Sequence, residues 1–239
     1  MTERRLDWEG CVNIRDLGGH PLAGGGRTKF GRVVRADAIR QLSDTGWASL
    51  VDYGVRTVVD LRFPSELDAD PPRELPVDVV HVPLLDERDA EAMAAIDHWD
   101  TTVGAYLEML ERFRPNFARA VSAIARAPEG AVLVHCQGGK DRTGLVVALL
   151  LTLAGVPPEE IADDYGLSAA NLEHLTAEWV AEAPHEQEAE RRRRISKGDP
   201  QTMLDVLTEL EARHGSVRTY LVEGGASEDE LDRAVRRLL

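Results

Sequence analysis

The residues that decide the fold occupy positions 130–155 and read GAVLVHCQGGKDRTGLVVALLLTLAG. The first seven of them form a short apolar run, which is typical of a strand buried on both faces of a parallel sheet. Residues 145–155 are mostly apolar and end at a glycine, with Pro157 and Pro158 close behind, as a buried helix does. The glycine pair between these parts predicts a tight loop, so the stretch is a strand, a loop and a helix in that order.

Three more apolar runs predict strands that precede this unit. They are GRVVRAD at 31–37, VRTVVDLR at 55–62 and VDVVHVPL at 77–84. Between the first two, SDTGWASLVDYG predicts a helix with Ser43 as its N-cap and Gly54 at its C-terminal stop. Strands that alternate with helices in this way favour an α/β domain with a largely parallel sheet.

Helical spacing dominates the rest of the chain. Residues 98–126 carry apolar side chains at that spacing. Among them we expect Trp99 in the core, with a binding patch as the alternative, and Pro115 is expected to kink or divide this helix. From Pro158 onward every segment has a helical pattern. Because no stretch has the composition of a linker, we predict a single α/β domain over 1–239. Its mostly parallel central sheet should be flanked by helices, and its C-terminal portion should be helical.

The charge balance narrows the range of partners. The 239 residues include 28 Lys and Arg against 42 Asp and Glu, which gives a formal net charge of −14. Nucleic-acid binding needs a basic face, so we expect no nucleic-acid partner. An anionic substrate would have to be captured by a local positive pocket that acts against the overall field.

Other features of the composition predict the compartment. The N-terminus, MTERRLDWEG, has no apolar stretch and is therefore not an ordinary signal peptide. The longest apolar run, 145–156, has 12 residues and is too short for a transmembrane segment. Two cysteines, Cys11 and Cys136, make no disulfide framework. We expect a soluble cytoplasmic protein, and export without a signal peptide stays open.

The loop at 137–143 has the composition of an oxyanion site. Gly138 and Gly139 let the backbone curl so that successive N–H groups face one side, and the following helix adds the positive end of its dipole. Arg142 lies six residues after Cys136, and its guanidinium can hold two phosphate oxygens at once. Lys140 adds a second positive charge. We predict that Gln137, Gly138, Gly139, Lys140, Asp141 and Arg142 bind a phosphate or another tetrahedral oxyanion.

The same loop would activate its cysteine. A thiol at a helix N-terminus beside Arg and Lys loses its proton well below the usual pKa, so we expect Cys136 to be a thiolate that attacks phosphorus. Asp141, inside the loop, is the nearest carboxyl group that can protonate the leaving oxygen and later take a proton from water. Thr143 is placed to hydrogen-bond the departing thiolate, and His135 to orient the loop from behind.

These residues support a family resemblance. HCQGGKDRTG at 135–144 resembles the phosphate-binding loop of cysteine-dependent protein tyrosine phosphatases. Its GKDRTG ending is similar to that of the atypical bacterial tyrosine and dual-specificity phosphatases, a family that includes phosphoinositide phosphatases. NIRDLGG at 13–19 resembles the N-terminal signature of that family. Weaker similarities are VVDLR with the later Glu66, VPLLD, IADDYGLS, and the closing YLVEGG and EDEL.

The resemblance implies a tyrosine-phosphatase-like fold with Cys136 as nucleophile, Arg142 as phosphate clamp and Asp141 as general acid and base. It also implies that the mobile-loop acid of eukaryotic tyrosine phosphatases is not needed, and no Trp-Pro-Asp occurs in the chain. The implied substrates are phosphotyrosine proteins, with phosphoserine, phosphothreonine or phosphoinositides as further possibilities. Some relatives cover the site with a helical lid, for which 171–199 is the candidate.

Several residues form a second tier of candidates. Asp60 and Arg62 close a predicted strand, where they would touch substrate, support Arg142, or simply fix the strand end through a salt bridge. Arg15 and Asp16 are expected to tie the N-terminal segment to the phosphate loop, with direct substrate contact as the alternative.

Other side chains carry weaker hypotheses. Asp86 is a rival general acid. Cys11 is expected to be an ordinary buried residue, with a reversible protective bridge to Cys136 as the alternative. The histidines other than His135 are scattered without metal-ligand spacing, so we predict no metal and no other cofactor.

Three readings compete with a phosphatase. A module that binds phosphorylated ligands without turnover would be expected to lack one of Cys136, Asp141 and Arg142, and all three are present. A P-loop triphosphatase needs a glycine where Val134 stands. A sulfur transferase also uses a loop cysteine, but leaves the neighbouring Asp and Arg unexplained.

Overall fold

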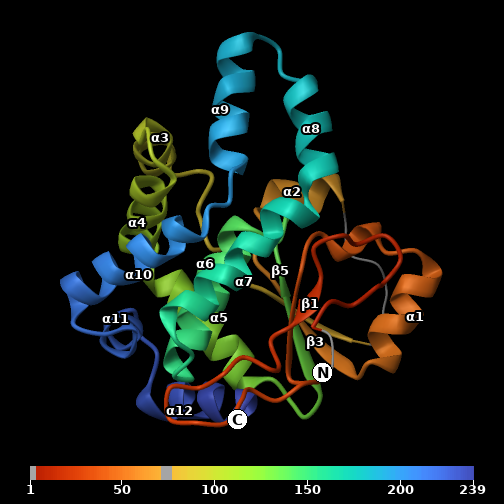
Figure 1. Cartoon of the computed structure of the whole chain (residues 1–239), viewed down its shortest axis with the longest axis vertical. Coiled ribbons are helices and arrows are strands. Elements are labelled where there is room, and N and C mark those ends of the chain that lie inside the picture. Colours follow the sequence, from red (N-terminus) through yellow and green to blue (C-terminus); the bar gives the residue numbers. More distant parts are fainter. Residues whose placement is uncertain (1–3, 71–76) are drawn as a thin grey trace.

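The computed structural model describes residues 4–70 and 77–239, and within them five strands form one sheet (Figure 1). Their order across the sheet is β1-β2-β5-β3-β4. All neighbouring pairs are parallel except β1 with β2. The prediction of an α/β fold with a mostly parallel central sheet is therefore confirmed. The strands are β1 Arg15–Asp16, β2 Val33–Ala36, β3 Val55–Asp60, β4 Asp78–His81 and β5 Ala131–His135.

Strand β5 lies at the centre and carries the reactive loop at its carboxyl end. Val134 of β5 pairs with Val59 of β3 and with Arg35 of β2, so the register brings the ends of three parallel strands to one edge. All five residues of β5 are buried, as its apolar run predicts. The strand predicted at 77–84 differs from β5 in its burial. It corresponds to β4, an edge strand whose four residues are all exposed.

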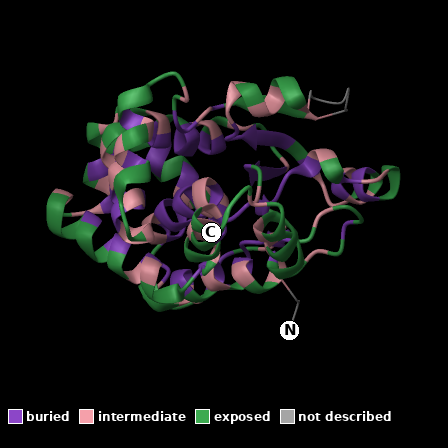
Figure 2. Cartoon of the chain, turned by 90° about the horizontal axis from the view of Figure 1, so that it is seen from above, coloured by how far each residue is buried: buried purple, intermediate pink, exposed green. Residues whose placement is uncertain are grey.

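Helices cover both faces of the sheet, and Figure 2 shows the buried strands between them. A small apolar cluster with Trp8, Trp47 and Leu50 packs α1 on one face. The larger core lies on the other face and includes residues from α3 to α7 and from α10 to α12. The helices are α1 Asp44–Asp52, α2 Pro64–Ala69, α3 Ala90–His98, α4 Thr102–Arg112, α5 Arg114–Arg126, α6 Asp141–Leu153, α7 Pro158–Asn171, α8 Glu173–Ala181, α9 Glu186–Ser196, α10 Pro200–His214, α11 Val217–Glu223 and α12 Glu228–Leu238.

The helical stretch predicted at 98–126 is divided, as Pro115 suggested. Helix α4 ends at Arg112 and α5 begins at Arg114, with the proline in its first turn, where its missing N–H costs no hydrogen bond. The placement of Trp99 in the core was wrong. Trp99 follows α3 as its C-cap and is 47% exposed, because α3 and α4 are separate helices and the residue lies in the connection between them.

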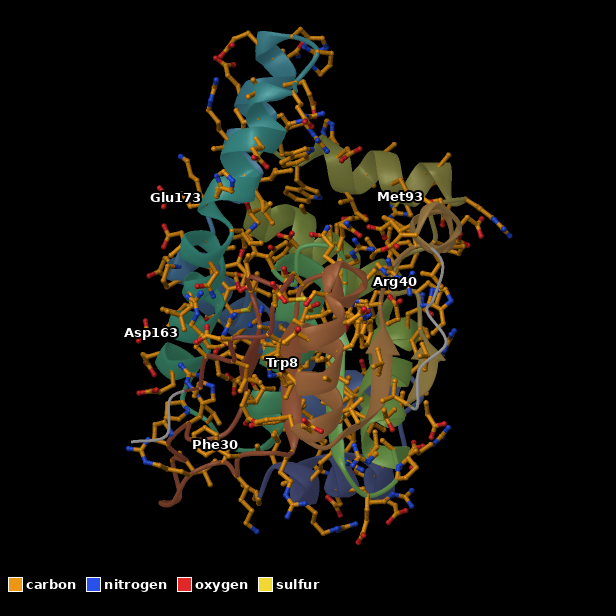
Figure 3. All side chains as sticks on the ribbon, turned by 90° about the vertical axis from the view of Figure 1, so that its right-hand side faces the viewer. Trp8, Phe30, Arg40, Met93, Asp163 and Glu173 are labelled. Carbon is orange, nitrogen blue, oxygen red and sulfur yellow. The ribbon has the colours of Figure 1, made fainter. Side chains whose placement is uncertain are left out.

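Helices α8 and α9 form a hairpin that projects from the body of the molecule (Figures 1 and 3). They account for most of the 171–199 stretch. Arg192 of α9 stacks on Trp179 of α8, with the guanidinium carbon 4.8 Å from the ring centroid. No helix among the described residues has the length and apolarity that crossing a bilayer requires.

A buried ionic cluster joins the N-terminal strands to α7. The carboxylate of Asp164 accepts from Arg4 at 2.9 Å, from Arg15 Nε at 2.9 Å and from Arg35 Nη1 at 2.7 Å. Burial acts to raise the pKa of Asp164, but the charges of Arg15 and Arg35 outweigh burial and hold this pKa far below its usual range. Burial and the charge of Arg15 lower the pKa of Arg35 to about 10, so Arg35 stays protonated at neutral pH. Three cations thus share one anion inside the protein.

Removing the anion should destabilise the fold strongly. We expect Asp164→Asn to lower the free energy of unfolding by about 3–5 kcal/mol in urea denaturation, because it leaves buried guanidinium groups without a counter-charge. The matched control is Asp163→Asn on the exposed side of the same helix (Figure 3), which should change stability by less than about 0.5 kcal/mol.

The pH dependence supplies a second check on this cluster. Because the folded pKa of Asp164 lies below the unfolded value of about 3.9, its stabilisation is present above that pH and is lost as the pH falls further. The difference between wild type and Asp164→Asn should therefore be constant from pH 5 to 7 and shrink below about pH 4. A difference that grows on acidification would contradict the assignment.

Candidate active site

The loop from Cys136 to Lys140 connects β5 to α6, and three of its carbonyl groups accept hydrogen bonds from residues outside the loop. Gln137 O accepts from the Ala38 N–H at 2.9 Å, and Gly138 O accepts from Asn13 Nδ2 at 3.0 Å. Gly139 O accepts from Arg35 Nη2 at 2.7 Å. In the described part of the chain, the N–H groups of residues 137–140 donate to no recorded acceptor. Backbone N–H groups arranged in this way at a helix N-terminus suit an anion.

Gly139 explains why this loop needs glycine. Its φ of +65° lies in the left-handed region, and a Cβ on it would lie 2.4 Å from the carbonyl oxygen of Ala36. The end of β2 therefore packs directly against the loop. Side chains larger than hydrogen at this position would push the loop away from the strand that supports it.

Cys136 lies at the end of β5 and is 2% exposed. His135 Nδ1 lies 3.0 Å from the Cys136 carbonyl oxygen, and its Nε2 lies 3.5 Å from Asp60 Oδ2. Burial acts to raise the pKa of Asp60, but the hydrogen bond and charge of His135 and the bonds from Arg62 lower it below its usual range. The hydroxyl of Thr143 is buried and has no hydrogen-bond partner among the described residues.

Arg142 is held by two hydrogen bonds to one carboxylate. Its Nη1 and Nη2 donate to the two oxygens of Glu66 at 2.6 and 2.8 Å. Its guanidinium carbon lies 4.7 Å from the ring centroid of Phe63. Burial acts to lower the pKa of Arg142, but the hydrogen bonds that Arg142 donates to Glu66 and the electrostatic interactions with Cys136 and Glu66 raise it. The guanidinium is therefore fixed in orientation and interacts electrostatically with the cysteine.

Asp141 is the first residue of α6, and two donors reach its Oδ1. Lys140 Nζ donates at 2.8 Å, and the Tyr106 hydroxyl forms a short hydrogen bond to the same oxygen. Partial desolvation acts to raise the pKa of Asp141, but the charge and hydrogen bond of Lys140, the Tyr106 hydrogen bond and the charge of Arg142 lower it. The carboxyl group is thus ionised at neutral pH. Its side chain is 47% exposed.

Lys140 links the loop to the helical hairpin. Besides its bond to Asp141, its Nζ donates to the Ile195 carbonyl oxygen near the C-terminus of α9 at 2.6 Å. This carbonyl belongs to the last turn of the helix, where carbonyl groups lack helical partners and favour a cation. The position of α9 is therefore tied directly to the residue beside Asp141.

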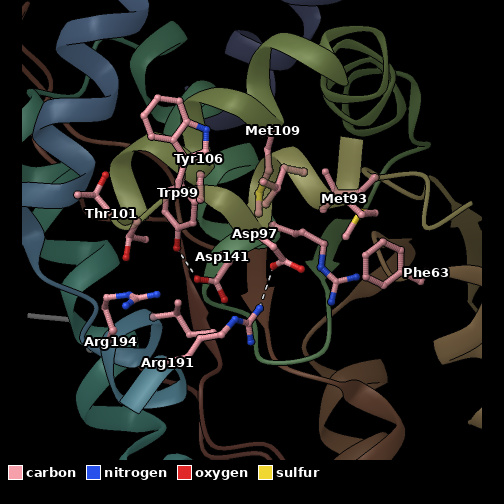
Figure 4. A pocket seen from close by; sticks show the side chains of 16 residues that line it. Phe63, Met93, Asp97, Trp99, Thr101, Tyr106, Met109, Asp141, Arg191 and Arg194 are labelled. Carbon is pink, nitrogen blue, oxygen red and sulfur yellow. Dashed lines mark hydrogen bonds and ion pairs between the residues drawn. The ribbon is translucent and has the colours of Figure 1, made fainter. Parts of the chain in front are cut away.

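A cavity of about 240 Å³ adjoins the loop (Figure 4). Asp141 and Arg142 reach it, and Cys136 is not among its lining residues. One part of its wall is apolar and comes from α2, α3, α4 and their connections: Phe63, Met93, Ile96, Trp99 and Met109. Helix α9 contributes Arg191 and Arg194, and Arg191 is paired with Asp97 at 2.9 Å. The cavity thus combines an apolar wall with a cationic side.

The second-tier residues lie behind or beside the loop. Asp60 and Arg62 bind each other at 2.8 Å, and Arg62 also reaches Asp70 at 3.3 Å. Arg15 binds Asp164 and donates to Asn13 Oδ1 at 2.7 Å, so it reaches the loop through Asn13.

The remaining candidates make local contacts. Asp16 accepts from the Tyr53 hydroxyl at 2.5 Å and from the Gly31 N–H at 2.8 Å. Asp86 is exposed and accepts from the Arg88 N–H at 3.0 Å. The Cys11 thiol lies 3.8 Å from the Ala38 carbonyl oxygen, and burial together with Asp37 raises its pKa above the usual range.

Sequence reasoning missed several partners of the loop. Glu66 was noticed only as part of a similarity, and Tyr106, Tyr165, Asp164 and Arg35 were not considered as site residues. One signal was available, because an arginine within the apolar run that became β2 needs a buried partner. Asp164 and Tyr165 lay within the weak IADDYGLS similarity, whereas Tyr106 carried no signal, because its helical spacing is equally typical of core residues.

Comparison with known proteins identifies the family of the chain. A family model described as "Tyrosine phosphatase family" matches residues 6–239. A tyrosine-protein phosphatase of Nostoc commune is 32% identical over 215 residues, which cover 86% of this chain and 73% of that protein. The triple specificity protein phosphatase PtpB of Mycobacterium tuberculosis is 28% identical over 275 aligned residues, which cover 98% of both chains. The chain therefore belongs to the tyrosine phosphatase family.

Proposed function

We propose that this phosphatase hydrolyses phosphomonoesters through a phosphocysteine intermediate on Cys136. The observation that carries the proposal is that three loop carbonyls bond to residues outside the loop, while the N–H groups of residues 137–140 have no acceptor in the described part of the chain and are available to an oxyanion. Arg142, whose orientation Glu66 holds, clamps two oxygens of the phosphoryl group. The likeness to named phosphatases over nearly the whole chain supports the same activity.

The first half-reaction transfers the phosphoryl group to sulfur. The Cys136 thiolate attacks phosphorus, the new S–P bond forms, and the P–O bond to the leaving group breaks. Asp141 delivers a proton to the leaving oxygen. Its pKa is low in the unliganded protein, and an approaching phosphate dianion raises it so that the carboxyl can carry that proton.

The second half-reaction returns the enzyme to its starting state. Water attacks the phosphocysteine, Asp141 accepts the proton of that water, and the S–P bond breaks to give inorganic phosphate and the thiolate. The partnerless Thr143 hydroxyl is available to donate a hydrogen bond to the departing sulfur. The groups that act on the reacting atoms in both half-reactions all belong to the loop and to α6.

Substrate must reach a cysteine that is only 2% exposed. We assign the entrance to the cavity between the loop and α9, because Asp141, Arg142 and Arg191 all line it. The α8–α9 hairpin then acts as a lid within a single domain, and its outward movement would break the Lys140 bond to Ile195.

The cavity favours a substrate with an apolar body. Its wall of Phe63, Met93 and Trp99 suits the ring of phosphotyrosine. The side chains of phosphoserine and phosphothreonine are shorter than that of phosphotyrosine. A phosphoinositide would bring additional anionic groups, which Arg191 and Arg194 would bind. The "triple specificity" in the name of the mycobacterial relative supports testing all three classes.

A binding module without turnover is the alternative function. The intact set of cysteine, aspartate and arginine speaks against it, as does the phosphatase naming of both relatives. A substrate panel of phosphotyrosine, phosphoserine and phosphoinositide compounds separates the two functions, because a binding module would release no phosphate from any of them.

Replacing the nucleophile should stop turnover. We expect Cys136→Ser to reduce p-nitrophenyl phosphate hydrolysis by at least about a thousandfold, while calorimetry still detects phosphate binding. Cys11→Ser is the matched control and should keep wild-type activity, because the interactions described for its thiol are with the Ala38 carbonyl oxygen and Asp37, which lie outside the loop at 136–140. Turnover near the wild-type rate in Cys136→Ser would refute the mechanism.

Replacing the general acid should affect poor leaving groups most. Asp141→Asn should slow phenyl phosphate hydrolysis by about 10²–10⁴-fold, and p-nitrophenyl phosphate hydrolysis by much less, because p-nitrophenolate leaves without a proton. Steady-state kinetics over a series of substituted phenyl phosphates measures this. An equal loss for all substrates would point to Asp86 or water as the proton donor.

Loosening the phosphate clamp should weaken catalysis without unfolding the protein. Glu66→Gln removes the charge that orients Arg142, and we expect kcat/KM to fall by about tenfold to a hundredfold. Asp68→Asn is the control, since it removes one charge from the exposed side of the same helix. If both variants keep wild-type kcat/KM, Glu66 does not position the clamp.

A further inference from the structure

We propose that Tyr106 is a positioning residue for the general acid. Its hydroxyl, itself oriented by Tyr165, holds Oδ1 of Asp141 so that the catalytic proton resides on Oδ2. This inference rests on the proposed role of Asp141 in protonating the leaving group. It adds two tyrosines from distant helices to the machinery of the loop.

The two hydroxyl groups have a defined direction of donation. An ionised carboxylate only accepts hydrogen bonds, so the short bond between Tyr106 and Asp141 uses the Tyr106 proton. The Tyr106 oxygen lies 2.9 Å from the Tyr165 oxygen, and either atom there is chemically able to donate. Because Tyr106 has already used its only proton, Tyr165 must be the donor. The chain of bonds therefore runs from Tyr165 through Tyr106 to Asp141.

Both tyrosines of this hydrogen-bond series are buried in the core. Tyr106 of α4 is 2% exposed and Tyr165 of α7 is 1% exposed, and their rings meet edge to face with centroids 6.2 Å apart. Burial and the neighbouring negative charge of Asp141 raise the pKa of the Tyr106 hydroxyl well above its usual value, so it remains a donor throughout the working pH range. A rigid donor of this kind fixes the rotation of the carboxylate it binds.

The second donor on the same oxygen decides which oxygen carries the proton. Lys140 Nζ also donates to Oδ1, at 2.8 Å, whereas Oδ2 accepts no recorded bond from the described residues. Placing a proton on Oδ1 would oppose two existing donors. The proton therefore goes to Oδ2, on a side chain that is 47% exposed and lines the cavity (Figure 4).

Other charges around the carboxyl must be held constant in any test. Arg142 follows it on α6, Lys140 precedes it, and Arg191 and Arg194 of α9 line the same cavity. Substituting Tyr106 by phenylalanine alters none of them and removes a single oxygen. This isosteric change is therefore the sharpest available probe.

The test is a leaving-group series with the Tyr106→Phe protein. We expect kcat for phenyl phosphate to fall by about tenfold to a hundredfold, because a hydrogen bond to a charged group is lost. For p-nitrophenyl phosphate the fall should be less than about threefold, and KM should stay within about twofold for both, because proton delivery and not binding is impaired. Tyr165→Phe should show the same pattern with a smaller effect, because Tyr106 keeps its own proton.

Tyr220→Phe is the matched structural control. Tyr220 is a fully buried tyrosine of α11 whose hydroxyl donates to the Leu110 carbonyl oxygen of the same helix α4 at 2.8 Å. Removing this hydroxyl shows the effect of a lost hydrogen bond to α4 when the hydrogen bonds of Asp141 are unchanged. It should lower thermal stability but affect good and poor leaving groups equally.

The outcomes separate this inference from the proposed function. If Asp141→Asn shows the leaving-group dependence and Tyr106→Phe shows none, or a uniform loss like that of Tyr220→Phe, the role of Tyr106 is overturned alone. If Asp141→Asn itself shows a uniform loss, the general-acid assignment fails and this inference fails with it. Selective loss in both variants supports both.

Discussion

The hydrogen bond from Arg35 to the Gly139 carbonyl oxygen is the contact on which the site depends. Arg35 is a fully buried residue in a central strand, and it also binds Asp164. One guanidinium thus connects the sheet, α7 and the phosphate loop. Together with the Asn13 and Ala38 bonds, it holds three loop carbonyls on partners outside the loop, and these bonds support the proposed role of the loop N–H groups in binding an anion.

The positive charges around the loop act against the negative net charge of the protein. A protein with a formal charge of −14 repels anionic substrates at long range, so the attraction has to be local. The guanidinium groups that share Asp164 lie behind the loop, while Arg142 and Lys140 lie within it. Burial strengthens the field of these cations, because water screens them poorly. Acidic residues elsewhere then contribute little at the phosphate position.

Three separate elements meet at Asp141, the proposed general acid. Asp141 begins α6, Tyr106 comes from α4, and Lys140 connects the same carboxylate to the end of α9. Lys140 therefore couples the position of α9 to the hydrogen bonding of Asp141. Contacts from α4 and α9 thus hold a carboxyl group that lies at the start of α6.

The sequence alone determined the strand, loop and helix at 130–155, the α/β class, and the identity of the residues within the loop. These follow from local patterns: apolar runs, adjacent glycines, and a cysteine and an arginine at fixed spacing. Only the tertiary structure decided that Glu66 holds Arg142, that Tyr106 reaches Asp141 and Tyr165 reaches Tyr106, and that Trp99 lines a cavity. Those contacts join residues 35 to 76 positions apart or depend on where two helices separate. No local pattern encodes them, because they arise when the sheet and its helices pack.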